Sequence, residues 1–134
     1  MKATVGNWVW RLGLGVMLGC GSVAVLGVAQ ASSVAQGKAI FDAQCAACHS
    51  VKPGVNGIGP SLYGVYGKPA AHVAGFAFSA ALKNSHLVWN KVTLSKFLAD
   101  PQALVPGTKM PYLGLPSAKK RDEVIAYLKN PEAK

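Results

Sequence analysis

Apolar and small residues repeat at helical spacing between residues 36 and 47. Gly37 and Phe41 lie four positions apart with Ile40 beside them, so the three share one side of a helix. The pattern predicts a helix from Gln36 to Ala47 whose Gly37–Phe41 side faces another element.

The C-terminal end of the chain has the same periodicity. Ser117 is a candidate helix cap, and Val124, Tyr127 and Leu128 mark the inner face of a helix that runs to about Lys129. No segment alternates apolar and polar residues as a half-buried strand does. The sequence therefore predicts an all-α fold.

Two shorter helices are expected in the middle of the chain. Residues 79–84 suit a short helical turn. Thr93 is a candidate N-cap for a helix that continues through Ala99 and is stopped by Pro101. The apolar side of this helix carries Leu94, Phe97 and Leu98.

Loops are expected to fill two further segments. Residues 51–75 are rich in glycine and proline, which exclude a long helix or strand and predict a loop wrapped around the interior. Residues 105–111 form a second loop, stiffened by Pro106 and Pro111 on both sides of Met110.

The N-terminus has the features of a secretory signal. Lys2 and Arg11 precede an uncharged apolar run that ends at Val28, and small residues at the right spacing place cleavage after Ala31 or Ala35. The run is marginal in length for spanning a bilayer, which needs about 20 residues, so an uncleaved anchor is the alternative.

We therefore expect residues 1–31 to be a signal peptide and residues 32–134 to be one exported domain, located in a bacterial periplasm and, under the alternative, tethered to the membrane. Removing the signal leaves Cys45 and Cys48 as the cysteines of the mature chain and Met110 as its methionine.

The chain is basic. Its net charge of +9 falls to +7 when Lys2 and Arg11 leave with the signal. An exported chain does not meet nucleic acid, so the charge indicates a surface for acidic protein partners. The mature domain is small for a self-sufficient core, and a bound prosthetic group would supply apolar interior.

The segment Cys45-Ala46-Ala47-Cys48-His49 reads as C-x-x-C-H, the attachment motif of c-type haem. Each thiol can add to a vinyl group of the haem, and the histidine then lies beneath the iron. The alternatives are a thioredoxin-like redox pair and half of a zinc site. The first needs a preceding strand and the second needs another ligand pair downstream, and the sequence offers neither.

The ligand on the other side of the iron decides the chemistry. Met110 is the favoured candidate because it lies in a proline-bounded loop 61 residues after His49, and a thioether opposite histidine raises the reduction potential. His72 and His86 remain alternative ligands. The sequence has no paired-carboxylate, nucleophile or phosphate-loop motif, so we expect no catalytic site.

Together these features resemble class I c-type cytochromes, of the mitochondrial-like kind also found in bacteria. The similarity covers nearly all of residues 36–129. It implies a small cytochrome c fold, in which the N- and C-terminal helices cross and loops and short helices wrap one covalently attached haem c. It also implies that Gly37 and Phe41 contact Val124 and Tyr127.

The resemblance implies roles for three further residues. Pro60 matches the proline whose carbonyl accepts the N–H of the proximal histidine. Trp89 matches the buried indole that meets a haem propionate, and Thr108 belongs to the loop that presents the axial methionine. The expected cofactor-binding residues are thus Cys45, Cys48, His49, Pro60, Trp89, Thr108 and Met110, with His49 and Met110 as metal ligands.

This chain also departs from the family pattern. Polar residues that the family often places near the propionates and the methionine sulfur are replaced by Lys68, Phe78, Leu82 and Phe97. Two lysines of the docking ring of mitochondrial members are replaced by Gln44 and Gln102, although Lys109 remains.

The expected function is single-electron transfer between redox proteins of the membrane or periplasm, which dock on a basic face around the haem edge. We expect a monomer that has no small-molecule substrate and is not an enzyme. The rival hypotheses are a haem c subunit of a periplasmic oxidoreductase or peroxidase and a gas-binding sensor. An open coordination position would favour either rival, and Met110 argues against both.

Overall fold

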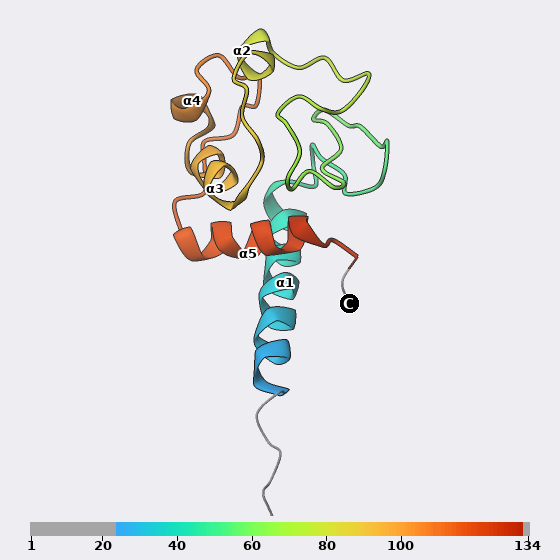
Figure 1. The fold of residues 1–134 in the computed structure, drawn as a ribbon, viewed down its shortest axis with the longest axis vertical. Helices are drawn as coiled ribbons and strands as arrows, with labels where there is room; N and C mark the ends of the chain where they lie inside the picture. The colour runs from blue at the N-terminus through green and yellow to red at the C-terminus, as the bar shows by residue number, and fades with distance from the viewer. Residues whose placement is uncertain (1–23, 133–134) are drawn as a thin grey trace, which may run out of the picture.

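The computed structural model describes residues 24–132. Its helices are α1 (Ala24–Gln44), α2 (Ala80–Lys83), α3 (Lys91–Ala99), α4 (Pro101–Leu104) and α5 (Ala118–Lys129). Helices α1 and α5 cross, and α2, α3, α4 and the long loops gather on one side of the crossing (Figure 1). The described residues form no β-strand beyond a single bridge between Pro69 and Val88, so the predicted all-α class is confirmed.

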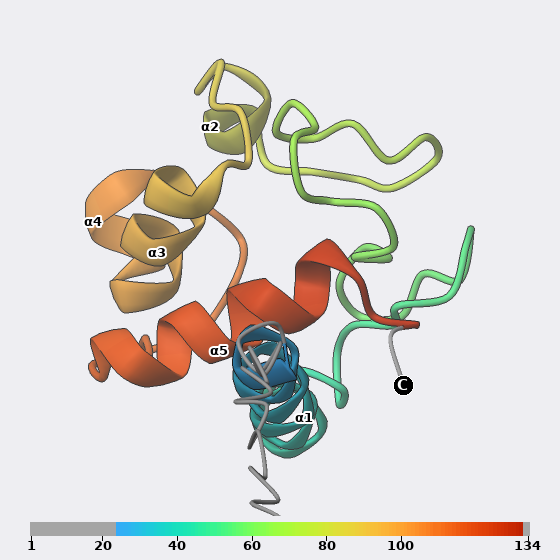
Figure 2. The same cartoon turned by 60° about the horizontal axis from the view of Figure 1, so that its bottom comes forward.

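The crossing of α1 and α5 is built on the residues that the sequence singled out. The rings of Phe41 and Tyr127 pack with their centroids 5.4 Å apart. A Cβ at Gly37 would clash with the carbonyl oxygen of Glu123 and lie 2.9 Å from the Tyr127 Cβ. The two backbones therefore meet at Gly37. Figure 2 shows α5 crossing α1.

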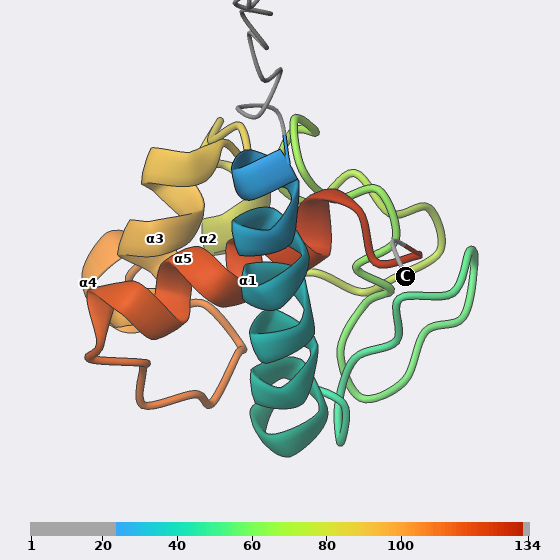
Figure 3. The ribbon, with the colours of Figure 1, turned by 90° about the horizontal axis from the view of Figure 1, so that it is seen from below.

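Helix α1 differs from its predicted range of 36–47 at both ends. The helix is described from Ala24, and its turns before residue 36 extend past the crossing, as Figure 3 shows from below. It ends at Gln44 because the N–H groups of Cys45 and Ala46 both donate to the carbonyl of Phe41, at 2.8 and 2.9 Å, which breaks the α-helical register.

Most of the expected signal segment 1–31 lies outside the described residues. Within the described part of the chain, no helix is both long enough and apolar enough to cross a bilayer.

The expected N-cap of α3 was wrong. Asn90 is the cap, because its side-chain oxygen accepts from the N–H groups of Val92 and Thr93 at 2.9 and 3.0 Å. Thr93 occupies the third helical position and its hydroxyl accepts from the Asn90 N–H at 3.0 Å, which completes a capping box.

Pro101 does more than stop α3. It begins α4, where its missing N–H costs nothing, and Asp100 caps that helix by accepting from the Ala103 N–H at 3.0 Å. The other predicted ends are confirmed, since α2 lies between Ser79 and Asn84 and α5 runs from its cap Ser117 to Lys129.

The long loop is fastened to the segment before α3. Gly67 N–H donates to the Trp89 carbonyl at 2.7 Å, Trp89 N–H to the Lys68 carbonyl at 2.8 Å, and Ala70 N–H to the Leu87 carbonyl at 2.7 Å. These bonds fix one wall of the interior in a chain whose loops have little regular structure.

Candidate functional site

A cavity of about 600 Å³ opens between the end of α1, the long loop, α3 and the loop before α5. Each of the seven residues expected to bind the cofactor lines it. Cys45, Cys48 and His49 come from the turn after α1, while Met110 comes from a loop 61 residues further along the chain. The fold therefore brings residues that are far apart in the sequence together at one cavity.

Apolar side chains form most of the rest of the cavity wall. They include Leu62, Val65, Phe76, Phe78, Leu82, Leu94, Phe97, Leu98, Val124 and Leu128. A cavity of this size with a few polar groups suits a large, mainly apolar ligand.

The two cysteines lie in a tight turn after α1. Cys48 N–H donates to the Cys45 carbonyl at 3.0 Å, and His49 N–H donates to the same carbonyl at 2.9 Å. The cysteines are not joined in a disulfide. Burial, followed by the nearby Cys48, raises the pKa of the Cys45 thiol to about 11. Redox-active C-x-x-C pairs depend on a lowered thiol pKa, so this turn does not suit a thioredoxin-like function.

The histidine after the cysteines is held by one hydrogen bond. Its Nδ1–H donates to the carbonyl of Pro60 at 2.8 Å, which leaves Nε2 as the ring nitrogen free to bind a metal. Ligation through Nε2 with a carbonyl on Nδ1 is a usual arrangement for metal-binding histidine.

Backbone bonds hold the Pro60 carbonyl in place. Gly59 N–H donates to the Cys48 carbonyl at 2.9 Å, and Leu62 N–H donates to the Ser50 carbonyl at 2.7 Å. The Ser61 hydroxyl is buried and donates to the Lys52 carbonyl at 2.7 Å. The chain before and after Pro60 is therefore tied to the segment that carries His49.

The ring of His49 lies directly against Gly59. A Cβ at Gly59 would stand 2.7 Å from Nδ1 and 2.8 Å from Nε2 and would clash with Cε1 of the imidazole.

We expect Gly59→Ala to rotate the His49 ring and to lengthen the hydrogen bond between its Nδ1 and the Pro60 carbonyl. Electron paramagnetic resonance of the oxidised protein should show changed g-values. Gly54→Ala is the control for replacing a loop glycine, since a Cβ there meets no atom within 4 Å and its φ of +68° strains only the local turn. Identical spectra for both variants would contradict the close packing.

The loop that carries Met110 is shaped by a proline–glycine turn. Thr108 N–H donates to the Val105 carbonyl at 3.0 Å, with Pro106 and Gly107 at the two central positions. Gly107 has a φ of +87°, as the third position of a type II turn requires. Thr108 is buried, and its hydroxyl oxygen lies 3.5 Å from the Met110 nitrogen.

Sequence reasoning missed the hydrogen bonds of the two glutamines. The Gln102 amide donates to the Thr108 carbonyl at 2.8 Å and accepts from the Gly107 N–H at 3.2 Å. The Tyr112 hydroxyl donates to the side-chain oxygen of Gln44 at 2.6 Å. Burial raises the pKa of Tyr112, so this hydroxyl is protonated at neutral pH. Neither contact leaves a local sequence signal.

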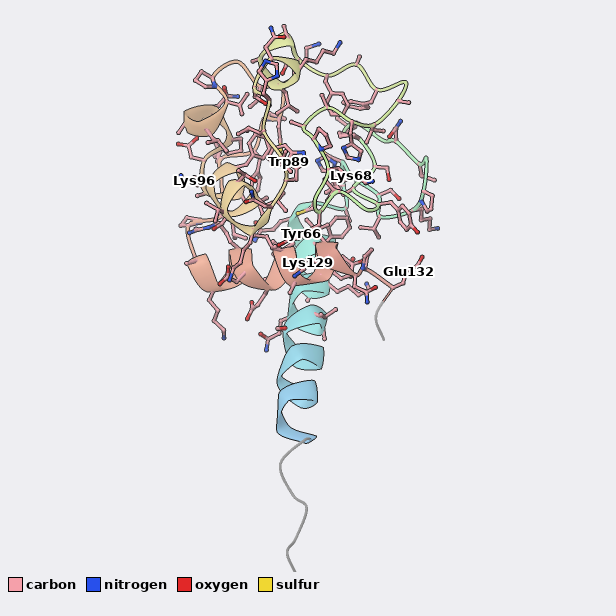
Figure 4. All side chains as sticks on the ribbon, viewed as in Figure 1. Tyr66, Lys68, Trp89, Lys96, Lys129 and Glu132 are labelled. Carbon is pink, nitrogen blue, oxygen red and sulfur yellow. The ribbon has the colours of Figure 1, made fainter. Side chains whose placement is uncertain are left out.

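Trp89 is 6% exposed and packs against Phe97 with ring centroids 5.0 Å apart. Figure 4 shows Trp89 beside Lys68, whose backbone carbonyl accepts from the backbone N–H of Trp89. The same view shows Lys129 next to Tyr66, with its ammonium nitrogen 4.8 Å from the ring centroid. Of these residues, Trp89 lines the cavity, and Lys68, Lys129 and Tyr66 do not.

The two alternative histidine ligands differ in position. His72 lines the cavity, and one of its ring nitrogens lies 3.1 Å from the Pro69 carbonyl. His86 is exposed, has a φ of +51° and is not among the residues that line the cavity. Among the described residues no three His, Cys, Asp or Glu side chains cluster to hold a metal ion, so the zinc alternative lacks its remaining ligands.

Comparison with known proteins agrees with this geometry. The model of the "Cytochrome c" family matches residues 34–131. The chain belongs to the cytochrome c family. Cytochrome c2 iso-2 of Magnetospirillum fulvum is 52% identical over 86 residues, which cover 64% of this chain and 90% of the relative. Cytochrome c of Euglena viridis is 47% identical over 94 residues, which cover 70% of this chain and 92% of the relative.

A solved structure, cytochrome cH from Methylobacterium extorquens, superposes with a TM-score of 0.68 at 47% identity. The match covers 72% of this chain and 96% of that one. This chain is therefore a class I monohaem cytochrome c with the small all-α cytochrome c fold and one covalently bound haem c. Its relatives are cytochromes, which makes electron transport the general function.

The residues present fit a haem. The cavity is apolar, two unpaired cysteines lie at its wall, and a histidine offers Nε2 from a fixed ring. Gly59 leaves space for that ring which any other residue would fill.

Proposed function

We propose that Cys45 and Cys48 form the thioether bonds to the haem and that His49 and Met110 are its axial ligands. The observation that carries the proposal is that one cavity brings the only methionine of the described residues together with a histidine whose Nδ1 is already bonded. Pro60, Trp89 and Thr108 support this arrangement by holding His49, closing the wall and shaping the Met110 loop.

Bound in this cavity, the haem supplies a one-electron ferric–ferrous couple. The chain supplies two ligands that need not move when the charge changes. His49 is fixed through Pro60, and Met110 is carried by a loop stiffened by a turn. The apolar wall excludes water, and a thioether opposite imidazole favours the ferrous state. With His49 and Met110 both bound to the iron, oxygen or a substrate would have no open site.

We further propose that the protein is exported as residues 32–134 and carries electrons between redox proteins outside the cytoplasmic membrane. Support comes from the apolar N-terminal run, the net charge of +9 and the similarity to bacterial cytochromes c2. Lys109 is exposed at the cavity beside Met110, so a basic docking face is expected there for acidic partners, which a monomer would meet by diffusion.

Charge at the cavity can be tested with hexacyanoferrate(III), a small anionic oxidant. We expect Lys109→Gln to slow oxidation of the reduced protein roughly twofold at low ionic strength, because one attracting charge is lost near the haem. The matched control is Lys120→Gln, an exposed lysine of α5 away from this cavity. Equal rates in the two variants, at unchanged reduction potentials, would contradict a docking face at Lys109.

A further inference from the structure

Gln102 reaches from α4 to the turn that precedes Met110. Its Nε2 donates to the Thr108 carbonyl at 2.8 Å, and its Oε1 accepts from the Gly107 N–H at 3.2 Å. One amide therefore bonds a donor and an acceptor on two successive residues, which holds the peptide groups before Gly107 and after Thr108.

Gln44 fastens the chain on the other side of Met110. It is the last residue of α1, and its Oε1 accepts from the Tyr112 hydroxyl at 2.6 Å. Tyr112 is partly buried and lines the cavity two residues after Met110, and Thr108 lines it two residues before. Side chains from two separate helices thus hold both flanks of the methionine.

The loop has few other bonds to keep it closed. Thr108 N–H donates to Val105 at 3.0 Å within the turn itself, and the contact between the Met110 nitrogen and the Thr108 hydroxyl is long at 3.5 Å. Segments held by few bonds open at a small free-energy cost. Removing a glutamine bond should therefore change the open population of this loop before it changes the rest of the fold.

We propose that Gln102 and Gln44 are positioning residues that keep the Met110 thioether in the cavity against competing ligands. The proposal rests on the Met110 ligation proposed above. Both glutamines are neutral, so the strength of their hydrogen bonds to the loop does not fall with added salt as the attraction of a lysine–carboxylate pair does. The replacement of docking-ring lysines by Gln44 and Gln102 then has a structural consequence at the methionine.

Imidazole binding to the oxidised holoprotein measures loop opening directly, because imidazole reaches the iron only when Met110 leaves. The apparent affinity scales with the open fraction. We expect Gln102→Ala, which loses two hydrogen bonds, to bind imidazole about tenfold more tightly, and Gln44→Ala, which loses one, about threefold. Both increases should persist at high salt.

Two further variants sharpen the test. Gln102→Glu keeps the size of the side chain and the acceptor for Gly107, but it sets a carboxylate against the Thr108 carbonyl, so it too should bind imidazole more tightly. Gln36→Ala removes an exposed glutamine of α1 that has no hydrogen bond to the loop and should bind like the unaltered protein.

A Gln102→Ala protein with a lower denaturation midpoint but unchanged imidazole affinity would overturn the proposal, since the glutamine would then stabilise only the fold. If Gln102→Glu alone bound like the unaltered protein, the amide donor would have no role. Absence of the long-wavelength thioether band in the unaltered protein would instead disprove Met110 ligation, which separates the two failures.

Discussion

Gly37→Ala is expected to destabilise the crossing of α1 and α5 strongly. Alanine favours a helix over glycine by about 1 kcal/mol, so a gain in stability would be expected from propensity alone. Here the new Cβ would clash with the Glu123 carbonyl and press on Tyr127, and both backbones belong to rigid helices. We expect a net loss of roughly 2 kcal/mol or more in the free energy of unfolding, measured by guanidinium denaturation of the holoprotein.

The control for this prediction is Ala43→Gly, at an exposed position of the same helix. It should lose about 1 kcal/mol from helix propensity alone. A Gly37→Ala protein as stable as the unaltered one, or more stable, would show that α1 and α5 do not approach as closely as the structure places them.

Met110→Ala is expected to have the largest effect on the redox chemistry. It removes the only thioether of the described residues from the cavity, so the oxidised protein should lose the weak long-wavelength thioether-to-ferric band. The reduction potential should fall, because the ligand that favours ferrous iron is gone. Visible spectroscopy and redox titration measure the two effects.

The alternative ligands provide the controls for Met110→Ala. His72→Ala and His86→Ala should leave the band in place, because one histidine is partnered near Pro69 and the other lies away from the cavity. Absence of the band from the unaltered protein, together with a reduction potential that changes in His72→Ala but not in Met110→Ala, would reassign the ligand to His72.

Local patterns were sufficient to predict much of this molecule. The helix of residues 118–129 was predicted with its cap because a serine precedes a regular apolar stripe. The resemblance to the cytochromes c predicted the contact at Gly37, and the structure shows that contact. The attachment motif, the proline-bounded methionine and the same resemblance singled out seven residues that all line one cavity, and their roles toward the haem stay predictions.

Other features could not be predicted from local patterns, because two residues compete for one role or because the partners lie far apart in the sequence. Thr93 looked like a cap, but Asn90 three residues earlier offers a better acceptor, and the two act as a pair. The bond between Gln44 and Tyr112 joins residues 68 positions apart, and only the packed fold brings them together. A single glutamine forms no periodic pattern or motif. The sequence therefore marked Gln102 only as a position where the family has a lysine.

We propose that the chain fills both iron positions, which would make the protein an electron carrier rather than a ligand-binding or catalytic haem protein. Carbon monoxide binds ferrous haem wherever a position is open, so its addition to the reduced, purified protein is the most direct test. We expect an unchanged visible spectrum for the unaltered protein and a shifted one for Met110→Ala. A shift in the unaltered protein at neutral pH would contradict the proposal.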